Sequence, residues 1–143
     1  MSRRARRLGA ALAGLLAAGG AAAESPQILY MLHCQGCHLA DGSGKPGEVP
    51  ALAGSLGRFL GVDGGRAYLV QVPGSAHSPL SDAELASVLN WMLQAFGPED
   101  TAGERVPYGA SEVARYRASP LVDVVATRAE LVRRIGLAAK PRP

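Results

Sequence analysis

Residues 33–38 of this chain read HCQGCH, which places two cysteines three positions apart with a histidine on each side. Cys34 and Cys37 are the only cysteines among the 143 residues. Thiols at this spacing can form a redox-active pair, supply two ligands to a zinc site, or carry a covalently attached group. The elements that surround them distinguish these chemistries.

The segment before the cysteines is predicted to be a helix. Ser25 and Pro26 are a typical N-cap and first helical residue, and three apolar residues follow at helical spacing: Ile28, Leu29 and Leu32. A thioredoxin-type dithiol needs a preceding strand within a βαβ unit, which this pattern does not provide. A zinc site needs two further ligands, and His33 and His38 lie too close to the cysteines to complete an ordinary tetrahedron.

The remaining interpretation is that Cys-x-x-Cys-His is the signature of c-type haem attachment. Two residues between the thiols let a turn of helix bring both sulfurs to the two vinyl groups of one haem, where they form thioethers. His38 would then lie under the iron as its proximal ligand. The sequence therefore predicts one covalently attached haem c, bound through Cys34, Cys37 and His38.

The N-terminus has the pattern of a cleaved secretion signal. Four arginines within residues 3–7 precede an apolar run over 8–18, and residues 21–23 are small enough for a signal peptidase. The apolar run is shorter than the ~20 residues that a membrane-spanning helix requires. We predict a signal peptide over 1–23, a mature chain that begins at Glu24, no membrane span after cleavage, and a periplasmic location.

Removal of the signal changes the charge balance of the chain. The full sequence has 15 basic and 12 acidic residues, but loss of four arginines leaves a mature net charge of −1. Aromatic residues make up only 5% of the chain. A basic surface with interleaved aromatics, as nucleic-acid binding requires, is therefore not expected. The mature length fits one domain with a modest core.

The segment CQGCHLADGSGKPGEVPALAG resembles the haem-binding segment of small class I bacterial c-type cytochromes. In that family a glycine-rich loop follows CxxCH, and a proline carbonyl after the loop accepts a hydrogen bond from the proximal histidine. The resemblance assigns this role to Pro50, or alternatively to Pro46. Three glycines, Gly42, Gly44 and Gly47, allow the tight turns that such a loop needs.

The resemblance resumes at LSDAELASVLNWMLQAF, which we predict to be the last core helix. Ser81 and Glu84 form a capping box, and Leu80 can pack against Leu85 as a hydrophobic staple. One apolar face comprises Leu85, Val88, Leu89, Met92, Leu93 and Phe96, and Gly97-Pro98 ends the helix. In the family this helix crosses the first helix near the haem edge, with an aromatic residue where Trp91 stands. Residues 57–72 are expected to form short helices broken at glycines.

One position departs from the family pattern. Its members usually supply a sixth iron ligand from a Met-Pro pair before the last helix, whereas this chain has Val72-Pro73. His77, in the same loop, is the candidate metal ligand; Met92 is a second possibility, and a water-bound or open site is a third. Met31 and His33 precede the attachment signature on the proximal side and cannot reach the distal face.

Residues 98–143 lie beyond the minimal haem domain, which we place at 24–97. A polar linker over 98–111 is followed by a predicted helix that starts at Ser119-Pro120 and ends at Gly136. Its apolar face is expected to contain Leu121, Val124, Val125, Leu131, Val132 and Ile135, with Arg128, Arg133 and Arg134 opposite. The extension carries a net charge of +2, against −3 for residues 24–97. It either packs on the core or docks a partner enzyme.

The sequence thus predicts an all-α class I cytochrome c fold with a C-terminal helical extension. The resemblance implies a one-electron carrier rather than an enzyme, with a dehydrogenase as donor and a cytochrome or terminal oxidase of the respiratory chain as acceptor. An alternative is a haem protein whose open sixth site binds small ligands or performs peroxidase-like chemistry. A scaffold protein with a Cys34–Cys37 disulfide and no haem is a third hypothesis.

Overall fold

The computed structural model describes residues 23–97 and 106–138. The predicted signal peptide over 1–23, except Ala23, and residues 98–105 of the predicted linker lie outside the described residues. Every regular element in the described part is a helix, which confirms the all-α fold class. The elements are α1 (Pro26–His33), α2 (Gln35–His38), η1 (Leu56–Gly61), α3 (Gly65–Gln71), α4 (Pro73–Ala76), α5 (Asp82–Phe96), α6 (Ala110–Arg117) and α7 (Val124–Ala138).

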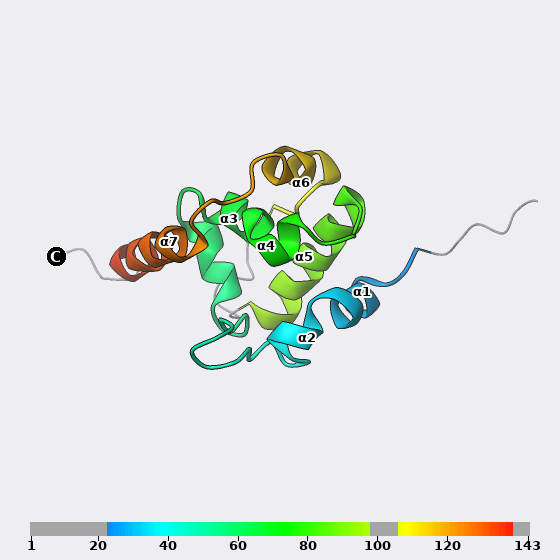
Figure 1. The fold of residues 1–143 in the computed structure, drawn as a ribbon, viewed down its shortest axis with the longest axis horizontal. Coiled ribbons are helices and arrows are strands. Elements are labelled where there is room, and N and C mark those ends of the chain that lie inside the picture. Colours follow the sequence, from blue (N-terminus) through cyan, green and yellow to red (C-terminus); the bar gives the residue numbers. More distant parts are fainter. Residues whose placement is uncertain (1–22, 98–105, 139–143) are drawn as a thin grey trace, which may run out of the picture.

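Helix α5 lies at the centre of the molecule (Figure 1), with α1 on one side and α6 on the other. Its start is confirmed in detail, because the Ser81 hydroxyl accepts a bond from the Glu84 N–H and the Glu84 carboxylate accepts one from the Ser81 N–H. Leu80 and Leu85, the two staple residues, are both buried. The six predicted apolar residues of α5 are also buried, so the helix face was assigned correctly.

The short middle helices also form where they were predicted. Gly64 caps the start of α3 with a φ of +81°, a left-handed conformation that favours glycine. At Gly65 a side chain would collide with the carbonyl oxygen of Phe59, so η1 and α3 can pack closely only with glycine there. Phe59 then stacks on Tyr68 with ring centroids 5.2 Å apart.

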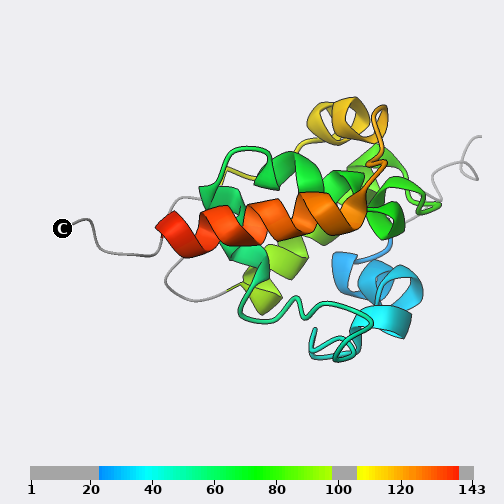
Figure 2. The same cartoon turned by 60° about the vertical axis from the view of Figure 1, so that its left-hand side comes forward.

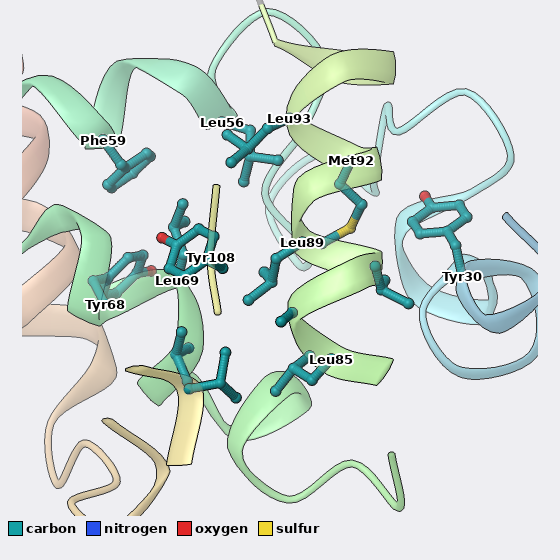
Figure 3. Close-up of a cluster of buried hydrophobic side chains, with 14 of the residues drawn as sticks. Tyr30, Leu56, Phe59, Tyr68, Leu69, Leu85, Leu89, Met92, Leu93 and Tyr108 are labelled. Carbon is teal, nitrogen blue, oxygen red and sulfur yellow. The ribbon is translucent and has the colours of Figure 1, made fainter. Parts of the chain in front are cut away.

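A single apolar core connects α1, η1, α3, α5, α6 and α7, and Figure 3 shows its central part. Its central members come from η1, α3 and α5, and include Leu56, Leu69, Leu85, Leu89 and Leu93. The extension contributes Tyr108, Val113 and Leu131, which are 4%, 0% and 4% exposed. Both α6 and α7 therefore pack on the core.

The structure corrects the prediction for the extension in three ways. The last helix begins at Val124 rather than at Ser119-Pro120, because the Asp123 carboxylate accepts the N–H of Ala126. Helix α6 was not predicted at all, and it occupies the end of the expected linker and the residues after it.

The third correction concerns the face of α7. Figure 2 shows this helix alongside η1 and α3, which it contacts. It packs through Leu131 together with Val124 and Ile135, whereas Val125 and Val132 are 81% and 43% exposed. The face of α7 that contacts the core therefore lacks two of the six predicted apolar residues, Val125 and Val132.

Candidate functional site

The two cysteines and His38 lie where α1 ends and the four-residue helix α2 begins. Cys34 ends α1, where its N–H donates to the Tyr30 carbonyl at 2.9 Å, and its own carbonyl accepts the N–H groups of Cys37 and His38 at 3.2 and 3.0 Å. Cys37 is exposed, and the side chains of Cys34 and His38 are half-buried. The backbone thus presents two thiols and one imidazole within a single turn.

The electrostatics of Cys34 do not resemble those of a redox-active dithiol. Burial raises the pKa of its thiol, and the neighbouring Cys37 raises it further. In CxxC oxidoreductases the attacking cysteine has a lowered pKa, because only the thiolate is a good nucleophile. The two sulfurs are not joined to each other by a disulfide. These surroundings therefore do not favour the thiolate that disulfide exchange requires.

The ring of His38 is oriented by a backbone carbonyl. Its Nδ1 lies 3.2 Å from the carbonyl oxygen of Pro50, so Nδ1 donates and Nε2 is left as the nitrogen that can bind a metal. Burial lowers the pKa of His38, although the Pro50 contact partly opposes this shift. Neutral imidazole is the form that coordinates iron. Two thiols that can attach to the porphyrin and one oriented imidazole that can bind the iron therefore fit haem c.

Residues 39–54, which we call the attachment loop, fold back onto His38. The Gly44 N–H donates to the His38 carbonyl at 3.1 Å, and the Leu52 N–H donates to the Gly42 carbonyl at 2.7 Å. Gly44 has a φ of +67°, and a side chain on it would collide with the carbonyl oxygens of Val49 and Pro50. Glycine at this position therefore allows the Pro50 carbonyl to approach the imidazole.

The residue after His38 has a strained backbone. Leu39 has φ +62° and ψ 169°, a region that is populated almost only by glycine. Two hydrogen bonds stabilise it: its N–H donates to the Gln35 carbonyl at 2.8 Å, and its carbonyl accepts the Tyr30 hydroxyl at 2.6 Å. The chain thus turns sharply at the end of α2, directly beside the proposed ligand.

Tyr30 also connects this turn to α5. Its ring lies 5.2 Å from the rings of both Trp91 and Phe96, measured between centroids, and Trp91 meets Phe96 edge to face. The family resemblance anticipated that the first and last core helices cross with an aromatic residue at Trp91, and the structure agrees. Trp91 packs against the core, so these contacts give it a structural role.

The segment expected to supply a sixth ligand begins with α4, whose first residue is Pro73. Val72 precedes it and cannot bind iron. His77 caps the C-terminal end of α4 through its N–H and is exposed, whereas Met92 is 6% exposed among the buried core side chains (Figure 3). Met31 is 50% exposed on α1. The predicted metal pair His38 and His77 therefore remains a prediction.

Sequence reasoning missed the polar contacts that fix the extension. Arg66 donates to both carboxylate oxygens of Glu112, at 2.6 and 2.8 Å, and Arg117 donates to the segment around His77. The Asn90 side chain bonds to both the N–H and the carbonyl of Tyr108. These partners are 18 to 46 residues apart, and no local pattern indicates such pairs.

Comparison with known proteins agrees with a haem c site. No family model matches the chain. One Cytochrome c-552 from Thermus thermophilus is 34% identical over 140 aligned positions, covering 84% of this chain and 95% of the relative. Another Cytochrome c-552 from the same species is 35% identical over 118 positions, covering 68% of this chain and 90% of that relative.

Proposed function

The chain belongs to the class I c-type cytochromes, and we propose that it is a monohaem one-electron carrier of the periplasm. The observation that carries this proposal is the Cys34–Cys37–His38 turn with the His38 Nδ1 directed at the Pro50 carbonyl. Each residue has a defined task. The two thiols would form thioethers with one haem and Nε2 of His38 would bind its iron, while the Pro50 carbonyl fixes the imidazole ring.

The protein contributes binding and surroundings, while haem iron, when bound, supplies the Fe(III)/Fe(II) couple. The attachment loop, whose Gly44 N–H donates to the His38 carbonyl, would keep the residues that hold the group in place. An imidazole oriented by a backbone carbonyl is a stronger electron donor to a metal than one free to rotate, because the hydrogen bond increases its basicity. The Pro50 carbonyl would thus stabilise the ferric state as well as fix the orientation of the His38 ring.

The proposed partners are proteins. A dehydrogenase is proposed as donor, and a cytochrome or terminal oxidase of the respiratory chain as acceptor. The N-terminal signal pattern supports export to the periplasm. Among the helices that the structure describes, none has the length and apolar character needed to cross a membrane.

The direct test is a visible spectrum and redox titration of the mature protein, made with the periplasmic haem-attachment machinery. We expect a c-type spectrum and a reversible one-electron transition. His38→Ala should leave little holoprotein, whereas His33→Ala is a matched control, since His33 is exposed at the end of α1 and outside the five-residue signature. Equal holoprotein yields from both variants would contradict the role of His38.

Two observations favour a second function, small-ligand binding at an open sixth site. Valine stands before Pro73, where the family has methionine, and the side chain of Met92 is buried in the core. The sixth position could then be open, and the chain would bind small ligands or act as a peroxidase. His77 remains our proposed ligand within the electron-carrier function. Bound imidazole would give a low-spin ferric protein with a lower potential than thioether ligation, because imidazole favours the ferric state.

The sixth ligand is tested by two variants. His77→Ala should turn a low-spin ferric protein high-spin and allow it to bind carbon monoxide once reduced. A wild type that is already high-spin and binds carbon monoxide quickly would favour the open site instead. A weak far-red charge-transfer band that disappears in Met92→Leu would overturn both interpretations, because it would assign the ligand to α5.

A further inference from the structure

Arg117, in the last turn of α6, reaches the segment between α4 and α5. Its guanidinium donates four hydrogen bonds: to the carbonyls of Ala76 at 3.1 Å, Ser78 at 2.7 Å and Leu80 at 2.8 Å, and to the Asp82 carboxylate at 2.9 Å. The side chain is only 17% exposed. One residue of the extension therefore binds three alternate carbonyls of the core.

These carbonyls lie on both sides of His77, the proposed sixth ligand. We call residues 77–81 the α4–α5 loop. Its other backbone bonds lie at its two ends: the N–H groups of His77 and Ser78 donate to the carbonyls of Pro73 and Ser75, and the Ser81 carbonyl accepts the N–H of Leu85. Among the hydrogen bonds of the described residues, those of Arg117 are the ones that fix the carbonyls at positions 78 and 80. The conformation of the loop thus depends on a side chain 37 to 39 residues away in the sequence.

The chemistry of the site requires arginine rather than any cation. A guanidinium has five N–H donors in a planar arrangement, so it can bind several acceptors in fixed directions. A lysine ammonium has three donors on one nitrogen and cannot span carbonyls on alternate residues. Asp82 supplies the compensating charge for a side chain that is mostly removed from water.

We propose that Arg117 is a positioning residue for the sixth coordination position of the haem iron. By fixing the backbone on both sides of His77, it determines what the α4–α5 loop presents to the iron and how easily an external ligand enters. This inference rests on the proposed function, since it requires a bound haem. It assigns the C-terminal extension a part in the redox site that packing of α6 alone does not require.

Arg66 provides a matched control. It is also a partly buried arginine, 25% exposed, and it also joins α6 to the core, through Glu112 and the Val106 carbonyl. It lies on α3, and its hydrogen bonds go to the extension rather than to the α4–α5 loop. Arg66→Lys should therefore weaken the contact at the first turn of α6, where Glu112 lies, and keep the Arg117 hydrogen bonds at its last turn, whereas Arg117→Lys should release the loop.

The experiment compares full-length wild type, Arg117→Lys and Arg66→Lys, each loaded with haem. Amide hydrogen exchange reports opening of residues 76–82, and the carbon monoxide binding rate of the reduced protein reports access to iron. We expect both rates to rise roughly tenfold in Arg117→Lys, the factor that follows from loss of a charge-assisted hydrogen bond. In Arg66→Lys both rates should stay near those of the wild type.

Asp82→Asn is a second variant that keeps Arg117 and removes only its charged acceptor, so it should shift both rates in the same direction by a smaller factor. Equal changes in Arg117→Lys and Arg66→Lys would overturn the inference, as would faster loop exchange with an unchanged carbon monoxide rate. A wild type without covalent haem would instead contradict the proposed function, which the inference requires. The two failures are therefore distinguishable.

Discussion

The attachment loop and the α4–α5 loop are both irregular, but different parts of the chain stabilise them. In the attachment loop, most backbone bonds begin and end within residues 38–56, as between Gly44 and His38 and between Leu52 and Gly42. The α4–α5 loop depends on Arg117, which belongs to α6. The proposed proximal side of the haem site is thus built locally, and the loop proposed for the distal side is completed by the extension.

This difference indicates which part of the chain can change without loss of haem attachment. A change in α6 or α7 should alter stability and the α4–α5 loop while the His38–Pro50 contact remains. A change in residues 38–54 should affect the attachment site directly.

Deletion of residues 98–143 is expected to have the largest effect. It exposes the core surface that Tyr108, Val113 and Leu131 now cover. Burial of each such side chain contributes roughly 1.5–3 kcal/mol, so we expect the melting temperature to fall by about 20 °C or more. Thermal unfolding followed by circular dichroism measures this change.

Hydrogen exchange on the same truncated protein sharpens the comparison. Amides 76–82 should lose protection, while the Leu52 amide should keep it. If the truncated protein does not fold, Val113→Ala provides a milder form of the test, since this fully buried side chain comes from α6. A melting temperature within a few degrees of the wild type would show that the extension does not support the core.

Gly44→Ala tests the local construction of the attachment loop. A methyl group there collides with two carbonyl oxygens, one of which is the Pro50 acceptor of His38. Gly47→Ala is the matched control, because Gly47 also has a positive φ, +79°, but has open space around it. We expect Gly47→Ala to lower the free energy of unfolding by about 1–2 kcal/mol from backbone strain alone. Gly44→Ala should lower it clearly more and should also reduce haem incorporation. Equal costs would contradict the proposed close approach.

Tyr30→Phe tests the strained turn beside His38. The variant keeps the aromatic contacts with Trp91 and Phe96 but removes the hydroxyl that donates to the Leu39 carbonyl. Loss of this bond should lower the free energy of unfolding by about 1 kcal/mol. Leu39→Gly relieves the backbone strain, so the double variant should recover part of the loss. Denaturant unfolding of the wild type, the two single variants and the double variant measures the coupling between the Tyr30 hydroxyl and the Leu39 backbone. If the two changes in unfolding free energy simply add, the hydroxyl does not stabilise the strained turn.

Glu112→Gln should give a similarly small effect, confined to the contact between α3 and the extension. Hydrogen bonds from Arg66 hold the pKa of Glu112 below its ordinary value of 4.5, so the ion pair stabilises the fold fully above that pH and is lost as pH falls through the lowered pKa. We expect the variant to be about 1 kcal/mol less stable near neutral pH. The difference should shrink below about pH 4.5, the ordinary pKa. A difference that grows on acidification would contradict the assignment.

The parts of the fold that follow from local pattern could be read from the sequence. The capping box at Ser81 and Glu84, the breaks at Gly61 and Gly64, and the helix before Cys34 each depend on residues within a few positions of one another. The same holds for the spacing of the attachment signature. Pro50 could be named as the acceptor for His38 only through the resemblance to a family.

Only the last helix of the extension could be predicted in this way, because long-range contacts determine the rest of its structure. Helix α6 has one buried apolar residue, Val113, and follows a breaker-rich segment, so its periodic signal is weak. Its position is fixed by Arg66 and Arg117, whose partners are distant in the chain. The start of α7 was misplaced because Ser119-Pro120 matches a cap pattern, while Asp123 is the residue that bonds the first turn.

The central claim, one haem attached through Cys34 and Cys37, is tested most directly by intact-mass measurement of the mature protein followed by peptide mapping. We predict the apoprotein mass plus one haem, an N-terminus at Glu24, and a haem-bearing peptide that contains both cysteines. In Cys34→Ser or Cys37→Ser the attachment should be lost or reduced to a single thioether. A native wild-type protein with the bare apoprotein mass and two titratable thiols at these positions would contradict the account.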